Sequence, residues 1–187
     1  MSVPGQIIGD PGAAAGGSGL WESFDGGAKY GLVAERQTAE VLNEFALKLG
    51  GPTVLHNLFV PGAQANIDHV LVSGRKILLL DSKRWRPGFY WTLGSTRRGW
   101  TKVSHADTKT LPFALDRLAP LVPQAKFAKP LMVVWPSSTQ PNMSLWAFRP
   151  AGAHAVSGQT LGARLAARRL RSADPSVVSA LLPYVRR

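Results

Sequence analysis

The 187-residue chain contains no cysteine. This absence excludes disulfides and thiolate zinc sites, and it is compatible with the reducing cytoplasm in which we expect the protein. Long apolar runs are also missing: stretches such as 77–80 fall far below the roughly 20 residues that span a bilayer. No lysine or arginine precedes Lys29, so the N-terminus lacks the charged start of a signal peptide. We therefore expect no membrane partner.

Acidic residues are scarce relative to basic ones: 22 Lys and Arg against 11 Asp and Glu give a net charge of +11. Such an excess favours a polyanionic partner, since neutralising phosphates releases counterions. The alternative is a basic surface that only keeps the protein soluble. The segment from Lys83 to Ala106 holds six basic residues and no acidic one. A Walker A loop is missing as well, so ATP is not expected.

Residues 1–20 are rich in Gly, Ala and Pro, which predicts a flexible leader before a single domain over 21–187. A strong helix is predicted over 30–49, ended by Gly50-Gly51-Pro52. Its apolar stripe has spacings of three and four and comprises Ala34, Thr38, Val41, Leu42, Phe45 and Leu49.

After this helix the expected order is three strands, a helix, a strand and a mixed tail. Strands joined by tight turns pair antiparallel and a strand after a helix can add in parallel, which predicts an α/β fold with a mixed central sheet flanked by helices. A loop with Pro87, Gly88, Gly94 and Gly99 follows the first three strands. Asp174 and Pro175 are a suitable N-cap and first residue for the last helix, and Pro183 suits its end. The expected strands are 53–59, 66–72, 76–83, 131–135, 145–148 and 154–156, and the expected helices lie within 107–118, 159–171 and 175–185.

The segment 66–83 predicts a hairpin whose two-residue turn has Gly74 at its first central position, as in a type II′ turn. This turn pairs Ser73 with Lys76, and the register then places Asp68 opposite Asp81. Directly opposed residues have Cβ atoms about 4.5–5.5 Å apart, so the two aspartates share one face. Lys83 lies two residues beyond Asp81 and shares that face too.

Two adjacent carboxylates repel each other unless something compensates. A magnesium ion would compensate, because it takes oxygen ligands and keeps positions open for a phosphate substrate. The structural alternative is an ion cluster in which Lys83 alone bridges the aspartates. Glu35 begins the core-facing stripe of the first helix and could supply a third carboxylate. Its structural alternative is an exposed first-turn acid favoured by the helix dipole.

Histidines show no metal-binding spacing, and strand alternation places His69 on the face opposite Asp68, which indicates a structural role. Aromatic residues are interleaved with basic residues after Lys83, a pattern that can stack bases and hold phosphates. The alternative is a hydrophobic β-hairpin in which Trp91 and Trp100 pack the domain. The residues expected to bind nucleic acid are Arg84, Arg86, Arg97, Arg98, Trp100 and Lys102.

Three motifs resemble the nuclease-related domain (NERD) family of the PD-(D/E)xK nuclease superfamily. They are Gly31-x-x-Ala34-Glu35, Ile67-Asp68-His69-Val70 and Leu80-Asp81-Ser82-Lys83, and the resemblance extends over about 29–185 in element order. It implies a restriction-endonuclease-like core. Two features depart from the family pattern. Asp81 stands where the family usually has Glu, and Trp100 is not followed by the family Gln.

The resemblance implies that Glu35, Asp68 and Asp81 bind Mg²⁺ or Mn²⁺ and that Lys83 orients the attacking water or stabilises the transition state. We therefore expect a metal-dependent DNA endonuclease with these four catalytic residues, acting in DNA repair, recombination, plasmid transfer or defence, on branched DNA among other substrates. The alternatives are a non-catalytic DNA-binding module and a structure-specific RNA nuclease. Many superfamily members act as dimers, so a homodimer is a further expectation from the resemblance.

Overall fold

The computed structural model of the protein describes residues 3–12, 27–63, 65–106, 109–139 and 142–186. Its central feature is a seven-stranded mixed sheet in the order β1-β2-β3-β4-β9-β11, with β8 pairing β4 beside β9. Strands β2, β3 and β4 are antiparallel, whereas β9 pairs parallel to β4 and β11 parallel to β9. The predicted mixed sheet is confirmed. Its strands are β1 (Ile7–Ile8), β2 (Thr53–Phe59), β3 (Asn66–Ser73), β4 (Lys76–Trp85), β8 (Lys126–Phe127), β9 (Leu131–Pro136) and β11 (His154–Ser157).

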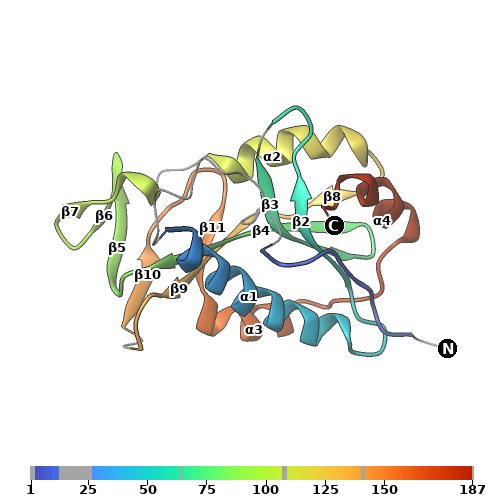
Figure 1. Ribbon diagram of the computed structural model, residues 1–187, viewed down its shortest axis with the longest axis horizontal. Helices are drawn as coiled ribbons and strands as arrows, with labels where there is room; N and C mark the ends of the chain where they lie inside the picture. The colour runs from blue at the N-terminus through green and yellow to red at the C-terminus, as the bar shows by residue number, and fades with distance from the viewer. Residues whose placement is uncertain (1–2, 13–26, 64, 107–108, 140–141, 187) are drawn as a thin grey trace.

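Helices cover both faces of this sheet (Figure 1). Helices α1 (Gly27–Ala46) and α3 (Gly158–Ala166) pack on the face that carries Leu71, Leu78 and Leu80. Helices α2 (Thr110–Leu118) and α4 (Pro175–Leu181) pack on the other face, against strand residues such as Val70 and Leu79. Short 3₁₀ turns occur at 104–106, 119–121 and 182–184. Both faces of β3 and β4 are therefore buried, and in the described part of the chain no helix is long and apolar enough to cross a membrane.

The β3–β4 hairpin has the predicted register, with Ser73 paired to Lys76, Val72 to Ile77 and Val70 to Leu79. Gly74 has φ +57°, the left-handed region required at the first central position of a type II′ turn. Its neighbour Arg75 is not in that region, which excludes a type I′ turn. The turn chemistry therefore sets which side chains of the two strands share a face.

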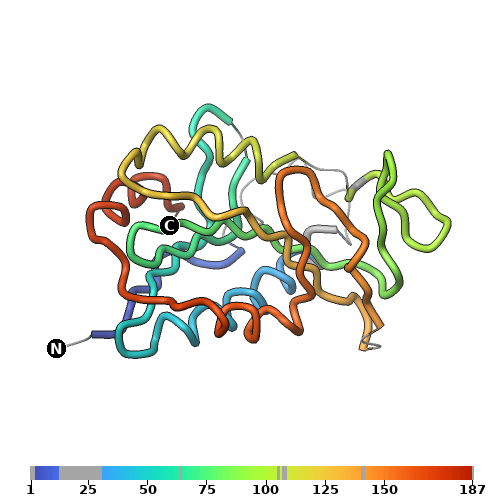
Figure 2. The backbone as a smooth tube through the Cα atoms, turned by 180° about the vertical axis from the view of Figure 1, so that it is seen from behind, coloured from blue at the N-terminus to red at the C-terminus, as the bar shows by residue number. Residues whose placement is uncertain are grey.

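The segment expected to be a loop around Pro87–Gly99 forms a second, four-stranded sheet instead. Its order is β10-β5-β6-β7, and it projects from one end of the molecule in both backbone views (Figures 1 and 2). The loop prediction was wrong because turn residues and strands alternate here within a few residues, so each strand is too short to show a period. The strands are β5 (Gly88–Leu93), β6 (Ser95–Arg98), β7 (Thr101–Lys102) and β10 (Met143–Ala147).

Two helix ends and part of the leader differ from the sequence prediction. Ile7 and Ile8 pair with β2, because Val54 N–H donates to the Gln6 carbonyl and gives this segment main-chain partners. Residues 13–20 of the expected leader lie outside the described residues. Helix α1 ends at Ala46, so Leu49 is exposed and not part of the core stripe. Helix α3 also ends early, at Ala166, whereas Asp174 caps α4 as predicted by accepting from Ser176 N–H.

Candidate active site

Asp68 lies where β3 and β4 separate. The paired residues of the hairpin end at His69 and Leu80, one step before Asp68 and Asp81. Beyond this point the Asp68 side chain takes the place of a main-chain acceptor, since its Oδ2 accepts the Ser82 N–H at 2.6 Å. From Leu80 onward β4 pairs with β9 on its other side. The carboxylate is thus fixed at the opening between the two strands, where it lines a cleft.

Asp81 and Lys83 follow on β4 and share the face of Asp68, because β4 alternates and Ile77 and Leu79 lie on that same face. Lys83 Nζ lies 2.8 Å from Asp81 Oδ1 and 2.7 Å from Oδ2. Asp81 is almost fully buried, while 29% of the Lys83 side chain is exposed. The ion pair therefore presents the ammonium group, and not the Asp81 carboxylate, to the surroundings.

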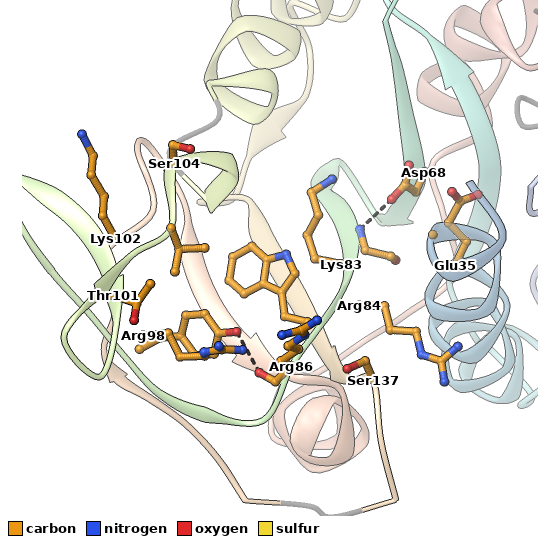
Figure 3. Close-up of a pocket in the computed structure, with 15 residues that line it drawn as sticks. Glu35, Asp68, Lys83, Arg84, Arg86, Arg98, Thr101, Lys102, Ser104 and Ser137 are labelled. Carbon is orange, nitrogen blue, oxygen red and sulfur yellow. Dashed lines mark hydrogen bonds between the residues drawn. The ribbon is translucent and has the colours of Figure 1, made fainter. Parts of the chain in front are cut away.

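Glu35 reaches this site from α1, although α1 packs on the opposite face of the sheet. The separation of β3 and β4 leaves room at the end of the sheet, and Figure 3 shows the Glu35 carboxylate directed toward Asp68. Glu35 is half-buried and lines the same cleft as Asp68 and Lys83. The three groups predicted from distant parts of the sequence come together here.

A buried hydroxyl fixes α1 on the sheet beneath these groups. Thr38 Oγ1 accepts hydrogen bonds from Ser82 Oγ at 2.9 Å and from Trp135 Nε1 at 2.8 Å, and it donates to the Ala34 carbonyl. These contacts join α1, β4 and β9 within one turn of Glu35. Thr38 was predicted only as a member of the helix stripe, although its polarity among apolar neighbours was a signal for this second role.

Burial and like charge both act on the carboxylates. Burial raises the pKa of Asp68 well above its usual value, and the nearby Asp81 raises it further, while Lys83 acts in the opposite direction. Burial also raises the pKa of Glu35, with Lys83 opposing and Asp81 adding to the effect. Burial disfavours the charge on Lys83, but the neighbouring carboxylates outweigh it and raise the lysine pKa. The lysine is therefore a stable cation among carboxylates that repel each other.

These groups open into a cleft of about 740 Å³ between the main sheet and the small sheet (Figure 3). Four of the six residues predicted to bind nucleic acid line it: Arg84, Arg86, Arg98 and Lys102. Arg97 and Trp100 are not among its lining residues, because they lie on a different part of the small sheet. The cleft is also lined by Thr101, Ser104 and Ser137, which were not predicted from the sequence. Only the pairing of β9 with β4 brings Ser137 there.

His69 has the structural role predicted for it. Its Nδ1 lies 2.8 Å from His56 Nδ1, and His56 Nε2 lies 3.0 Å from Asn43 Oδ1. Both rings are fully buried on the α1 face. Among the described residues, no three His, Asp or Glu side chains come together as a group that could hold a metal ion.

The donor chemistry of the cleft fits a hard divalent cation with two protein ligands. Glu35 and Asp68 both offer carboxylate oxygens, and their raised pKa values mark a site where negative charge is under-compensated. Magnesium is commonly held by one or two carboxylates together with water and substrate phosphates. Asp81 would contribute only if its contact with Lys83 rearranged.

Comparison with known proteins gives one positive result. No curated protein and no solved structure matches the chain. The family model described as "Nuclease-related domain" (NERD) matches residues 30–130, which is 101 of the 187 residues. The matched part includes all but the first three residues of α1, the β3–β4 hairpin and most of the basic cleft. It stops before β9, so the wider resemblance over 29–185 stays a prediction. On this match, the chain belongs to the nuclease-related domain family.

Proposed function

We propose that the cleft is the active site of a metal-dependent DNA nuclease. The observation that supports this most directly is that Glu35, Asp68 and Lys83 line the same cleft as four basic side chains. Carboxylates can hold a cation at a scissile phosphate, and basic groups on both sides can hold the adjoining phosphates. Membership of the nuclease-related family supports the reaction class.

Glu35 and Asp68 would hold the cation, with Mg²⁺ or Mn²⁺ as the proposed ion. Bound there, such an ion lowers the pKa of a water molecule and polarises a phosphate oxygen. Asp81 keeps Lys83 charged and in place through its two contacts of 2.7 and 2.8 Å. Lys83 Nζ donates to the phosphate oxygen on which negative charge builds up as the water attacks. Arg84, Arg86, Arg98 and Lys102 bind phosphates before the chemical step.

The test is cleavage of plasmid, linear and branched DNA by the parent and Lys83→Ala, with and without magnesium or manganese. Lys83 acts mainly when charge develops, so its loss should lower the cleavage rate by about 10²–10³-fold. DNA affinity, measured separately, should change little because the basic side chains of the cleft remain. A Lys83→Ala variant that is folded and cuts as fast as the parent would contradict the role given to this site.

One observation favours a second candidate, a non-catalytic DNA-binding module with the nuclease fold. Both Asp81 oxygens contact Lys83, which leaves this carboxylate engaged within the protein. The module would bind DNA through the same basic cleft. A parent protein that binds DNA with a steep salt dependence yet cuts none of the substrates with either metal would establish this candidate in place of the first. RNA substrates and the homodimer also stay predictions.

A further inference from the structure

The small sheet has two unlike faces. Tyr90 and Thr96 are buried on the inner face, where Tyr90 stacks on Trp85 with ring centroids 5.1 Å apart. Strand alternation places Phe89 and Trp91 on the outer face. The inner face thus attaches the small sheet to the core, and the outer face carries its remaining aromatic side chains.

Four aromatic residues form this outer surface in two contacting pairs. Phe89 and Trp146 have ring centroids 5.8 Å apart at an interplanar angle of 31°, and Trp91 and Trp100 meet edge to face at 6.5 Å. Trp146 is 74% exposed and Trp100 is 89% exposed. We call Phe89, Trp91, Trp100 and Trp146 the aromatic face. Large exposed aromatic groups gathered on one surface usually mark a binding site.

Trp100 is held in its exposed position by hydrogen bonds to its turn. Gly99 and Trp100 are the two central residues between Arg98 and Thr101, which are paired, and Gly99 has φ +55°. Trp91 Nε1 donates to the Gly99 carbonyl at 2.7 Å, and Arg97 Nη1 donates to the Trp100 carbonyl at 3.0 Å. The indole is therefore presented on a turn fixed at both central residues, which lowers the entropic cost of binding.

The charge around the aromatic face is positive. The guanidinium of Arg97 lies over the Trp91 ring, 5.7 Å from its centroid, and Arg149 donates to the Trp146 carbonyl. No acidic residue occurs between Lys83 and Ala106, the segment that contains β5, β6 and β7. The β6–β7 turn connects this face to the cleft: the paired residues Arg98 and Thr101 on either side of the turn line the cleft, whereas Trp100 within the turn belongs to the aromatic face.

We propose that the aromatic face binds an unpaired DNA strand that extends from the cleft, so that the preferred substrates are DNA molecules with a single-stranded segment next to a cut site. The substrate preference rests on the proposed nuclease function, whereas the binding of an unpaired strand does not. Unpaired bases would stack on Trp100 and on the Phe89–Trp146 pair, and Arg97 would contact the intervening phosphates.

The chemistry of this surface favours an unpaired strand over the other occupants of an aromatic patch. Base pairing and stacking in a duplex leave few base faces free, so a stacking surface discriminates in favour of single strands. A protein partner or a second copy would bury the aromatic rings equally well. However, the chain has a net charge of +11, so a second copy is repelled and a polyanion is attracted.

The test compares the parent with a Trp100→Ala/Trp146→Ala double variant in binding assays. The probes are a labelled oligothymidylate of roughly 12 nucleotides, a blunt duplex of similar length and an oligouridylate. A metal-free buffer containing EDTA prevents cleavage, so binding is measured independently of catalysis. Both tryptophans are exposed, so the fold should survive, and thermal unfolding checks this. The matched control is Phe113→Ala, which removes an exposed aromatic residue under Arg117 on α2.

We expect the double variant to bind the oligothymidylate about 10–100-fold more weakly while its duplex affinity changes less than about twofold. Trp100→Phe/Trp146→Phe should restore most of the loss, because phenylalanine still stacks. Phe113→Ala should bind like the parent. In cleavage assays the double variant should lose its preference for DNA with a single-stranded segment and keep its rate on duplex.

Four results would overturn the inference: unchanged oligothymidylate affinity in the double variant, an equal loss on the duplex, tighter binding of the oligouridylate than of the oligothymidylate by the parent, or a parent dimer that the double variant converts to monomer. If the oligothymidylate affinity of the double variant is unchanged and cleavage is normal, the role of the aromatic face is contradicted and the nuclease proposal stands. If the parent never cuts DNA and the double variant selectively loses single-strand binding, the nuclease proposal is contradicted and the aromatic face remains a binding site.

Discussion

Asp68 and His69 are neighbours in sequence, yet they belong to two buried polar groups of opposite character. Asp68 faces the cleft beside Glu35, Asp81 and Lys83, and burial and like charge raise its pKa well above the usual range. His69 faces α1 and pairs with His56, whose own pKa burial lowers to about 4 in spite of the nearby Asp10. Adjacent residues of β3 thus belong to a charged cluster that lines the cleft and to a neutral histidine pair that is enclosed in the core.

The two histidine rings hydrogen-bond to each other and to Asn43 within the core. Since His56 Nε2 donates to Asn43 Oδ1, its Nδ1 accepts and His69 Nδ1 donates, which is consistent with two neutral rings. The carboxylates achieve no such balance, because one lysine faces three acids. Unfavourable electrostatics that persist beside a cleft indicate a site kept for function, whereas a closed network indicates a structural role.

Asp68→Asn should have the largest effect on this comparison. The amide can still accept the Ser82 N–H, but it removes one negative charge from the cluster. We expect cleavage to fall by at least about 100-fold, because the proposed cation would lose one of its two carboxylate ligands. We also expect the melting temperature to rise by about 2–4 °C, from roughly 1 kcal/mol of relieved repulsion.

The measurements for this variant are a cleavage rate and a thermal melt. Asp116→Asn, at an exposed position on α2, is the matched control and should change neither value. A strongly destabilised Asp68→Asn protein would show that the carboxylate is mainly structural, as His69 is.

The His56–His69 pair should make the stability of the protein depend on pH. The folded-state pKa of His56 is about 4, below the value of about 6.5 expected when the chain is unfolded. Its stabilising contribution is therefore complete above about pH 6.5 and is lost as the pH falls toward 4, because only the unfolded chain takes up the proton. This loss amounts to about 1.4 kcal/mol per pH unit for one proton.

Denaturant unfolding of the parent and of His56→Gln at several pH values between about 7 and 5 measures this contribution. The variant should be less stable at neutral pH and should show a pH slope smaller by about one proton. An unchanged slope in His56→Gln would mean that His56 is not held neutral, and the distinction between the two clusters would weaken.

The smallest effect is expected from a single phosphate contact in the cleft. Arg98→Ala should weaken DNA binding several-fold and lower the slope of log affinity against log salt by about 0.9. Arg117→Ala, on α2 outside the cleft, should leave the slope unchanged. Equal slopes for Arg98→Ala and the parent would show that Arg98 in the cleft contacts no DNA phosphate, and that another basic surface binds the DNA.

Local rules were enough for the part of the site that lies on one hairpin. The glycine turn sets the register, and the register sets the common face of Asp68, Asp81 and Lys83. The seven strand residues 53–59 were predicted with the observed bounds because apolar and β-branched residues occupy five of the seven positions directly after Pro52. These features depend on neighbours in sequence, and the chemistry of a few residues decides them.

Tertiary structure alone decided the rest. The sequence placed Glu35 on the core side of a helix, but only the separation of β3 and β4 lets it reach across the end of the sheet to Asp68. The sequence suggested one set of basic and aromatic residues for nucleic acid. The small sheet divides that set: Arg98 lines the cleft, whereas Trp100 lies on an outer surface, to which β10, more than forty residues away, adds Trp146 beside Phe89. Short-range patterns determine which faces a strand has, whereas the partners that cover those faces come from distant parts of the chain.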